Sequence, residues 1–178
     1  MYSNRYGIVS QRKNMRLLKE RFVNEHTNSD WIKKLPYIDV AYAWGVSVKQ
    51  FHHPKSSVNG FYDPMYNIIW LYNMHPRIFL HELGHLSDGR NYTLSQVGEP
   101  EIFISHDIMI QYIQDEVVAE SVAIELLAER KYTHYAAGRE YSEQYIKDTC
   151  ELGDVSPDKI IESMSKRIKT AKENILDA

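Results

Sequence analysis

The chain of 178 residues has a single cysteine, Cys150, so it can form no internal disulfide. This scarcity favours a reducing compartment, and we expect Cys150 to be a small residue near a helix end rather than a nucleophile. No apolar stretch approaches 18 residues, so no transmembrane helix is expected. The residues after Met1 do not resemble a signal peptide, because no apolar core follows them. The sequence therefore predicts a cytoplasmic protein that does not enter a membrane.

A large excess of charge is also lacking, since the net charge is −3 and the pI is near 6.2. This balance gives no overall drive toward nucleic acid. The charge is nevertheless uneven, because residues 1–34 hold eight Lys and Arg against three Asp and Glu, which leaves a net charge of −8 on residues 35–178. We expect a basic helix at about 11–25. It is either a solvated face, which is the more common case, or a contact for nucleic acid or an acidic partner.

The most informative feature that is present is the pentapeptide His-Glu-Leu-Gly-His at residues 81–85. On a helix, His81 and His85 lie one turn apart on the same face, so both imidazoles can bind one zinc ion. Glu82 lies about 100° around the helix from His81, where its carboxylate can accept a proton from a zinc-bound water. Zinc lowers the pKa of such a water to about 7. The pentapeptide thus predicts two metal ligands, for Zn²⁺, and a general base.

The flanking residues predict that this motif lies on a helix over about 76–88. Pro76 is favoured in a first turn, and Asp88-Gly89 provides a stop, because Gly can adopt the left-handed conformation that often ends a helix. Gly84 is a poor helix former, costing about 1 kcal/mol relative to Ala. Its use inside the motif suggests that another backbone or a substrate passes close to it.

A third ligand is expected on a helix over about 106–130. Glu116 and Glu120 are i, i+4 neighbours on a face that also carries Ile113, Ile124 and Leu127. Carboxylates on a buried face need strong partners, and a metal ion with its histidine ligands would provide them. We expect Glu116 to bind the metal and Glu120 to accept a hydrogen bond that orients a histidine ring, the reverse order being the alternative.

Three segments of the chain carry a resemblance to a known family. Residues 60–71 read Gly-Phe-Tyr-Asp-Pro-Met-Tyr-Asn-Ile-Ile-Trp-Leu before the His-Glu-x-x-His, and residues 35–48 and 116–127 provide the other two segments. Together they resemble the ImmA/IrrE metallopeptidases, small zincin-like proteases of bacteria, phages and mobile elements. The family has a Glu-Ala-Asn type core where this chain has Val118-Ala119-Glu120, so Glu116 and Glu120 both remain candidate ligands. The segment 116–127 is also similar to the zincin domain of ArdC-like antirestriction proteins.

The resemblance implies one α+β, zincin-like domain over residues 1–178. A small, mainly antiparallel sheet would pack on the active-site helix and on the long acidic helix. The family-like core is expected at 35–130, between the basic extension at 1–34 and further helices at 131–178. The implied function is that of a zinc-dependent endopeptidase, with a gluzincin-like glutamate ligand, acting on a regulatory protein such as a phage or mobile-element repressor. The alternative is a binding protein that contacts DNA or a protein and acts by occupancy.

Local patterns predict the remaining elements. Strands are expected at 46–52, 57–62 and 67–72, the last as the edge strand that pairs with a substrate peptide. Asp30 and Asp39 are expected to cap short helices, and later helices are expected at about 139–151 and from Ser156-Pro157 onward. Asp115, Glu125 and Glu129 are expected on a solvated face of the acidic helix.

A donor for the oxyanion of the reaction is less well specified by the sequence. Its candidates are His134, Tyr132, Tyr135 and Tyr141. The adjacent His52 and His53 point to opposite faces if they lie on a strand, so they are not expected to chelate one ion.

Overall fold

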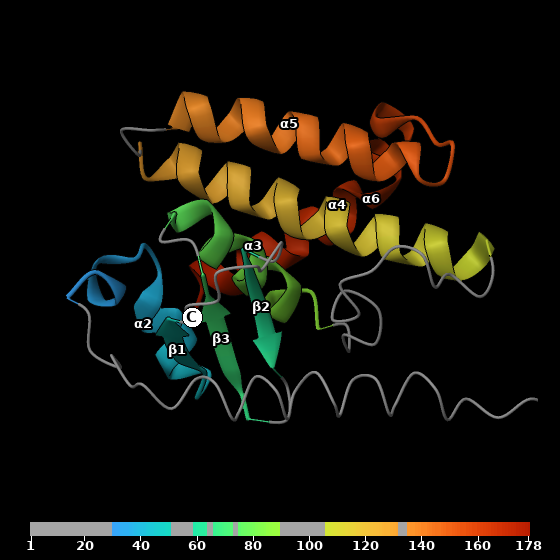
Figure 1. The fold of residues 1–178 in the computed structure, drawn as a ribbon. Helices are drawn as coiled ribbons and strands as arrows, with labels where there is room; N and C mark the ends of the chain where they lie inside the picture. Colours follow the sequence, from blue (N-terminus) through green and yellow to red (C-terminus); the bar gives the residue numbers. More distant parts are fainter. Residues whose placement is uncertain (1–29, 51–58, 64–65, 73–74, 90–105, 132–134) are drawn as a thin grey trace, which may run out of the picture.

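The computed structural model describes residues 30–50, 59–63, 66–72, 75–89, 106–131 and 135–178 (Figure 1). The predicted basic helix at 11–25 lies outside these residues, as do His52, His53, Tyr132 and His134. The described part is mixed α+β and mostly helical. Its helical elements are the 3₁₀ helix η1 (Ile32–Lys34) and the α-helices α2 (Ile38–Ala43), α3 (Pro76–Ser87), α4 (His106–Glu129), α5 (Tyr135–Glu151) and α6 (Pro157–Leu176).

A three-stranded sheet forms the other layer, with β1 (Ser47–Gln50), β2 (Gly60–Asp63) and β3 (Ile68–Leu71) in the order β1-β3-β2. The three strands lie within the predicted ranges, apart from the last residue of β2. The sheet is mixed rather than mainly antiparallel, because β1 pairs with β3 in parallel and β2 pairs with it antiparallel. The prediction that 67–72 is an edge strand is also wrong. β3 is central, and its backbone is already paired on both sides.

The helix α3 lies between the sheet and α4, and α5 covers the opposite side of α4 (Figure 1). The last helix, α6, packs on α4 and also contacts α3. The boundaries of α3 and α4 match the predicted helices to within one residue, and α5 begins four residues earlier than predicted. Within the described residues, no helix combines the length and the apolar character needed to cross a membrane.

The ends of α3 follow from its flanking residues. Pro76 is the first residue of the helix, and the Nδ1 atom of His75 caps it by accepting a hydrogen bond from the Arg77 backbone N–H at 3.1 Å. Gly89 follows the helix with a φ of +66°, which is the left-handed conformation predicted from the sequence. These caps hold the His-Glu-Leu-Gly-His segment inside a regular helix.

The predicted caps of the two short N-terminal helices are not found. The N-cap position of α2 is Tyr37, which has a φ of +63°, and Asp39 lies within the first turn of that helix. The N-cap position of η1 is Trp31, and Asp30 instead forms an exposed ion pair with Lys33. In both cases the aspartate is one or two residues away from the position at which its side chain could cap the helix.

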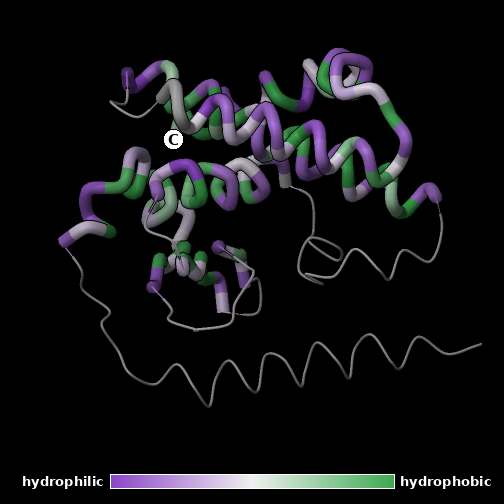
Figure 2. Tube along the Cα trace, turned by 45° about the horizontal axis from the view of Figure 1, so that its top comes forward, coloured by the Kyte–Doolittle hydropathy of each residue, from purple (hydrophilic) through white to green (hydrophobic). Residues whose placement is uncertain are grey.

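The buried apolar residues form two clusters that share α4. The larger one joins the sheet, α2, α3, α4 and α6, and the smaller one joins α4, α5 and α6. Cys150 belongs to the smaller cluster and is fully buried near the end of α5. Hydrophobic and hydrophilic segments alternate along α5 and α6, as expected for helices with one buried face (Figure 2). Because α4 contributes to both clusters, its middle part, residues 116–123, is buried on all sides.

One polar contact ties these helices together at the far end of α3. Arg167 on α6 hydrogen-bonds to Asp88 after α3 and to Asp115 on α4, the latter at 2.7 Å. Asp115 is therefore an ion-pair partner and is not on a solvated face as predicted. Glu125 and Glu129 are partly exposed, and both pair with Lys172.

The backbones of α3 and α4 approach each other closely at Gly84. A Cβ atom at this position would lie 2.9 Å from the Ala119 carbonyl oxygen and 3.0 Å from the Ala119 Cα. These are main-chain atoms of α4, so they cannot move aside as a flexible side chain could. The close approach of another backbone predicted from Gly84 is confirmed.

We predict that Gly84→Ala lowers the free energy of unfolding by about 1–3 kcal/mol, because forcing the two helices apart outweighs the better helix propensity of Ala. The matched control is Gly138→Ala in α5, where the added Cβ would make an ordinary 3.6 Å contact with Leu127. That variant should be more stable, by up to about 1 kcal/mol. Urea unfolding of both variants measures the difference. A Gly84→Ala protein as stable as the parent would contradict the close packing of α3 on α4.

Candidate metal centre

Three side chains from two helices converge on one point. His81 and His85 come from α3 and Glu116 comes from α4, and together they could hold a metal ion. The Nε2 atoms of the two histidines are 3.1 Å apart, and the Glu116 oxygens lie 3.3 Å from His81 Nε2 and 3.5 Å from His85 Nε2. A tetrahedral zinc ion with bonds of about 2.0–2.1 Å requires ligand atoms about 3.3–3.4 Å apart. The spacing of these donors and their chemistry, two imidazoles and a carboxylate, therefore fit zinc.

The second glutamate, Glu120, holds one of these histidines in place. Its Oε2 lies 2.8 Å from His81 Nδ1. Because an ionised carboxylate can only accept hydrogen bonds, this contact places a proton on Nδ1, so that in the neutral imidazole the lone pair of Nε2 is directed at the convergence point. Glu120 also accepts hydrogen bonds from Ser142 on α5 and from Arg77 Nη1, the latter at 2.6 Å and 2.8 Å. The Glu120 oxygens are thus engaged by His81, Ser142 and Arg77, whereas Glu116 supplies the carboxylate of the three-residue cluster.

The third acidic residue, Glu82, lies between this cluster and the sheet. Its side chain is buried and interacts with the charges of His81, His85 and Glu116. It also accepts a hydrogen bond from the Tyr62 backbone on β2. In an antiparallel pair of strands, hydrogen-bonded and non-hydrogen-bonded residue pairs alternate. The bond from Tyr72 N–H to the Asn59 carbonyl makes Asn59–Tyr72 a hydrogen-bonded pair, so Tyr62–Ile69 is a non-hydrogen-bonded pair. The backbone N–H of Tyr62 therefore points away from β3 and is available to Glu82.

Burial and charge act in opposite senses on the acidic residues of this site. Burial and the neighbouring Glu116 raise the pKa of Glu82, although the two histidines oppose the rise. Burial also disfavours the charged forms of Glu116 and Glu120, but their polar contacts outweigh it. Contacts with His81 and His85 lower the pKa of Glu116, and contacts with His81, Arg77 and Ser142 lower the pKa of Glu120 to about 2. For His81, the two carboxylates outweigh burial and raise the pKa well above its usual value. The cluster thus stabilises positive charge at its centre.

Arg77 and Tyr145, like Ser142, were not identified as site residues from the sequence. Arg77, one turn before His81, is buried and stacks its guanidinium over the Tyr141 ring at 4.1 Å. Tyr145 on α5 donates a hydrogen bond to Glu116 Oε2 at 2.6 Å, and its ring packs edge-on against that of His81. The helical spacing of Ser142, Tyr145 and the buried Ile146 would have placed them on one face of α5. It would not have indicated that this face covers α4.

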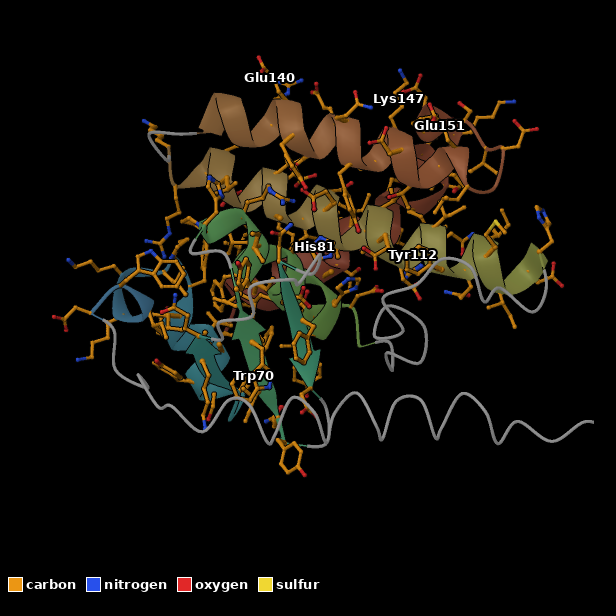
Figure 3. All side chains as sticks on the ribbon, viewed as in Figure 1. Trp70, His81, Tyr112, Glu140, Lys147 and Glu151 are labelled. Carbon is orange, nitrogen blue, oxygen red and sulfur yellow. The ribbon has the colours of Figure 1, made fainter. Side chains whose placement is uncertain are left out.

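The remaining described histidines and the candidate oxyanion donor Tyr141 are not among the three converging side chains. His75 caps α3, and His106 is exposed at the first residue of α4. Tyr141, a predicted oxyanion donor, is half exposed and packs on Arg77. The side chain of Tyr135 is outside the described part of the chain, and Tyr145 is hydrogen-bonded to the ligand residue Glu116. Figure 3 shows His81 pointing from α3 into the space beneath α4 and α5.

No protein-family model, curated protein or solved structure matches the chain.

We predict that Glu116→Gln weakens zinc binding more than Glu120→Gln does. The loss of an orienting partner typically costs about 10–100-fold in metal affinity, and the loss of a direct ligand should cost more. Competition with a chromophoric zinc chelator measures both affinities, with Glu129→Gln on the exposed side of α4 as the matched control. Zinc binding that survives in Glu116→Gln and disappears in Glu120→Gln would reverse the two roles.

Proposed function

We propose that the protein is a zinc-dependent endopeptidase whose ligands are His81, His85 and Glu116. The observation that carries this proposal is Glu82, a buried carboxylate that interacts with the charges of the three ligand side chains and accepts a hydrogen bond from the backbone of the edge strand β2. A site that uses zinc only for stability gains nothing from a general base at this position. It also tends to have four protein ligands, whereas the described residues bring three together.

His81, His85 and Glu116 would hold a zinc ion, which would supply Lewis-acid polarisation of the scissile carbonyl and would lower the pKa of a water molecule to about 7. Glu82 accepts the proton of the attacking water and then donates it to the leaving amine. The raised pKa of Glu82 suits both roles, because a base poised nearer to neutral pH can also return its proton. Glu120 keeps His81 in the tautomer that presents Nε2 to the ion, and Arg77 balances the Glu120 charge.

The substrate that this arrangement favours is an extended peptide added to the sheet beside β2. Strand addition supplies affinity through main-chain hydrogen bonds and selectivity through alternate side chains. Gly60 contributes to this edge, and its lack of a Cβ lets the strand approach Ile78 of α3, where an added Cβ would lie 2.7 Å from the Ile78 side chain. The family resemblance supports a regulatory protein, such as a phage or mobile-element repressor, as the natural substrate.

Glu82→Gln separates this function from a binding role. Glutamine cannot accept the proton, so the variant should bind zinc with wild-type stoichiometry and lose at least about 100-fold in cleavage rate. The assay is cleavage of a proteome-derived peptide library, read by mass spectrometry, with Glu125→Gln on the partly exposed side of α4 as the control that keeps activity. A wild-type protein that binds zinc but cleaves no peptide, and a variant that does not differ from it, would favour the alternative of a zincin-fold binding protein acting by occupancy.

A further inference from the structure

The contact between Tyr145 and Glu116 is a feature that the proposed reaction has not yet used. The Tyr145 hydroxyl donates to Glu116 Oε2 at 2.6 Å, which is short for a hydrogen bond of this type and is typical of a charged acceptor. The Tyr145 ring is fixed as well, because its centroid lies 5.8 Å from that of His81 in an edge-on arrangement. One side chain of α5 therefore contacts two of the three ligand residues on α3 and α4.

Each oxygen of Glu116 lies about as far from a histidine Nε2 atom as two ligands of one metal ion lie from each other. Oε2 is 3.3 Å from His81 Nε2, and Oε1 is 3.5 Å from His85 Nε2. Without a further constraint, both oxygens could bind one ion. A catalytic zinc site, by contrast, needs three protein ligand atoms and an open position for water or substrate. The site therefore needs a means to keep Glu116 from occupying two positions.

We propose that Tyr145 is a positioning residue that holds Glu116 Oε2, so that the carboxylate offers only Oε1 to the metal and one coordination position stays open. The hydrogen bond fixes the rotation of the carboxylate and draws electron density from Oε2. This role deepens the proposed function and rests on the same metal site, but it concerns ligand geometry and not the proton transfer by Glu82.

A second tyrosine supports the orientation of the first. The side chain of Tyr112, one turn before Glu116 on α4, is hydrogen-bonded to Tyr145. This contact is a second constraint on the Tyr145 side chain, beside its own hydrogen bond to Glu116.

The test uses Co²⁺ in place of zinc, because the visible absorption of Co²⁺ weakens as its coordination number rises. In Tyr145→Phe, both Glu116 oxygens become available, so the absorption should fall by roughly two-fold or more as the ion leaves tetrahedral geometry. Metal affinity should fall by no more than the about 10–100-fold that the loss of an orienting partner typically costs, since no ligand is removed. The matched control is Tyr141→Phe, one turn earlier on α5, which keeps its ring on Arg77 and should leave the spectrum unchanged.

An unchanged spectrum in Tyr145→Phe would overturn the proposal. If kcat also fell while the spectrum stayed the same, the hydroxyl would act on the substrate and not on Glu116, which likewise contradicts a positioning role. A wild-type protein that binds neither Co²⁺ nor zinc is a different outcome, because it would remove the metal site and with it the proposed function. The spectrum of the wild-type protein therefore distinguishes the two failures.

Discussion

The arrangement of this site depends on the buried contact of Glu120 with Arg77 and His81. Glu120 is completely inaccessible in the middle of α4, where an unpaired carboxylate would be very costly. Arg77 supplies the opposite charge from the first turn of α3, and Ser142 supplies a further donor from α5. Three helices are thus joined at one carboxylate. Removing either member of such a pair leaves the other buried and uncompensated, which typically costs about 3–5 kcal/mol.

This contact also sets the charge that a metal ion would meet. Because Arg77 balances Glu120, the carboxylates left to face a divalent cation are Glu116 and Glu82. Two negative charges match the two positive charges of zinc, so the occupied site would be close to neutral in a region from which water is largely excluded. The close approach of α4 to α3 at Gly84 brings these groups within reach of each other. Packing and electrostatics therefore support the same geometry.

Much of this arrangement follows from local sequence patterns. The helical spacing of His81 and His85, the end signals of α3 and the apolar helix face shared by Glu116 and Glu120 are all short-range properties, and the structure has each of them. The sheet order was not predictable in the same way, because the parallel pairing of β1 with β3 joins segments that no short pattern connects. For the same reason, the edge strand was assigned to β3 instead of β2.

The contributions of α5 were missed for a related reason. Tyr145 and Ser142 reach the site only because α5 packs along α4. The sequence of α5 indicates which face of the helix is buried, but it does not indicate which element packs against that face. Arg77 was missed although it lies in the same helix as the two histidines. A basic residue in a first turn is ordinarily solvated, and its burial depends on Glu120 from a distant part of the chain.

The most direct test of the metal site is a crystal structure of the zinc-loaded protein, with diffraction recorded on both sides of the zinc absorption edge. A single anomalous peak within about 2.0–2.2 Å of His81 Nε2, His85 Nε2 and a Glu116 oxygen is the expected result. Glu120 should remain bonded to Arg77 and His81 without contacting the ion. An anomalous peak at another place, or none at full zinc saturation, would contradict the central claim that these three side chains form a zinc site.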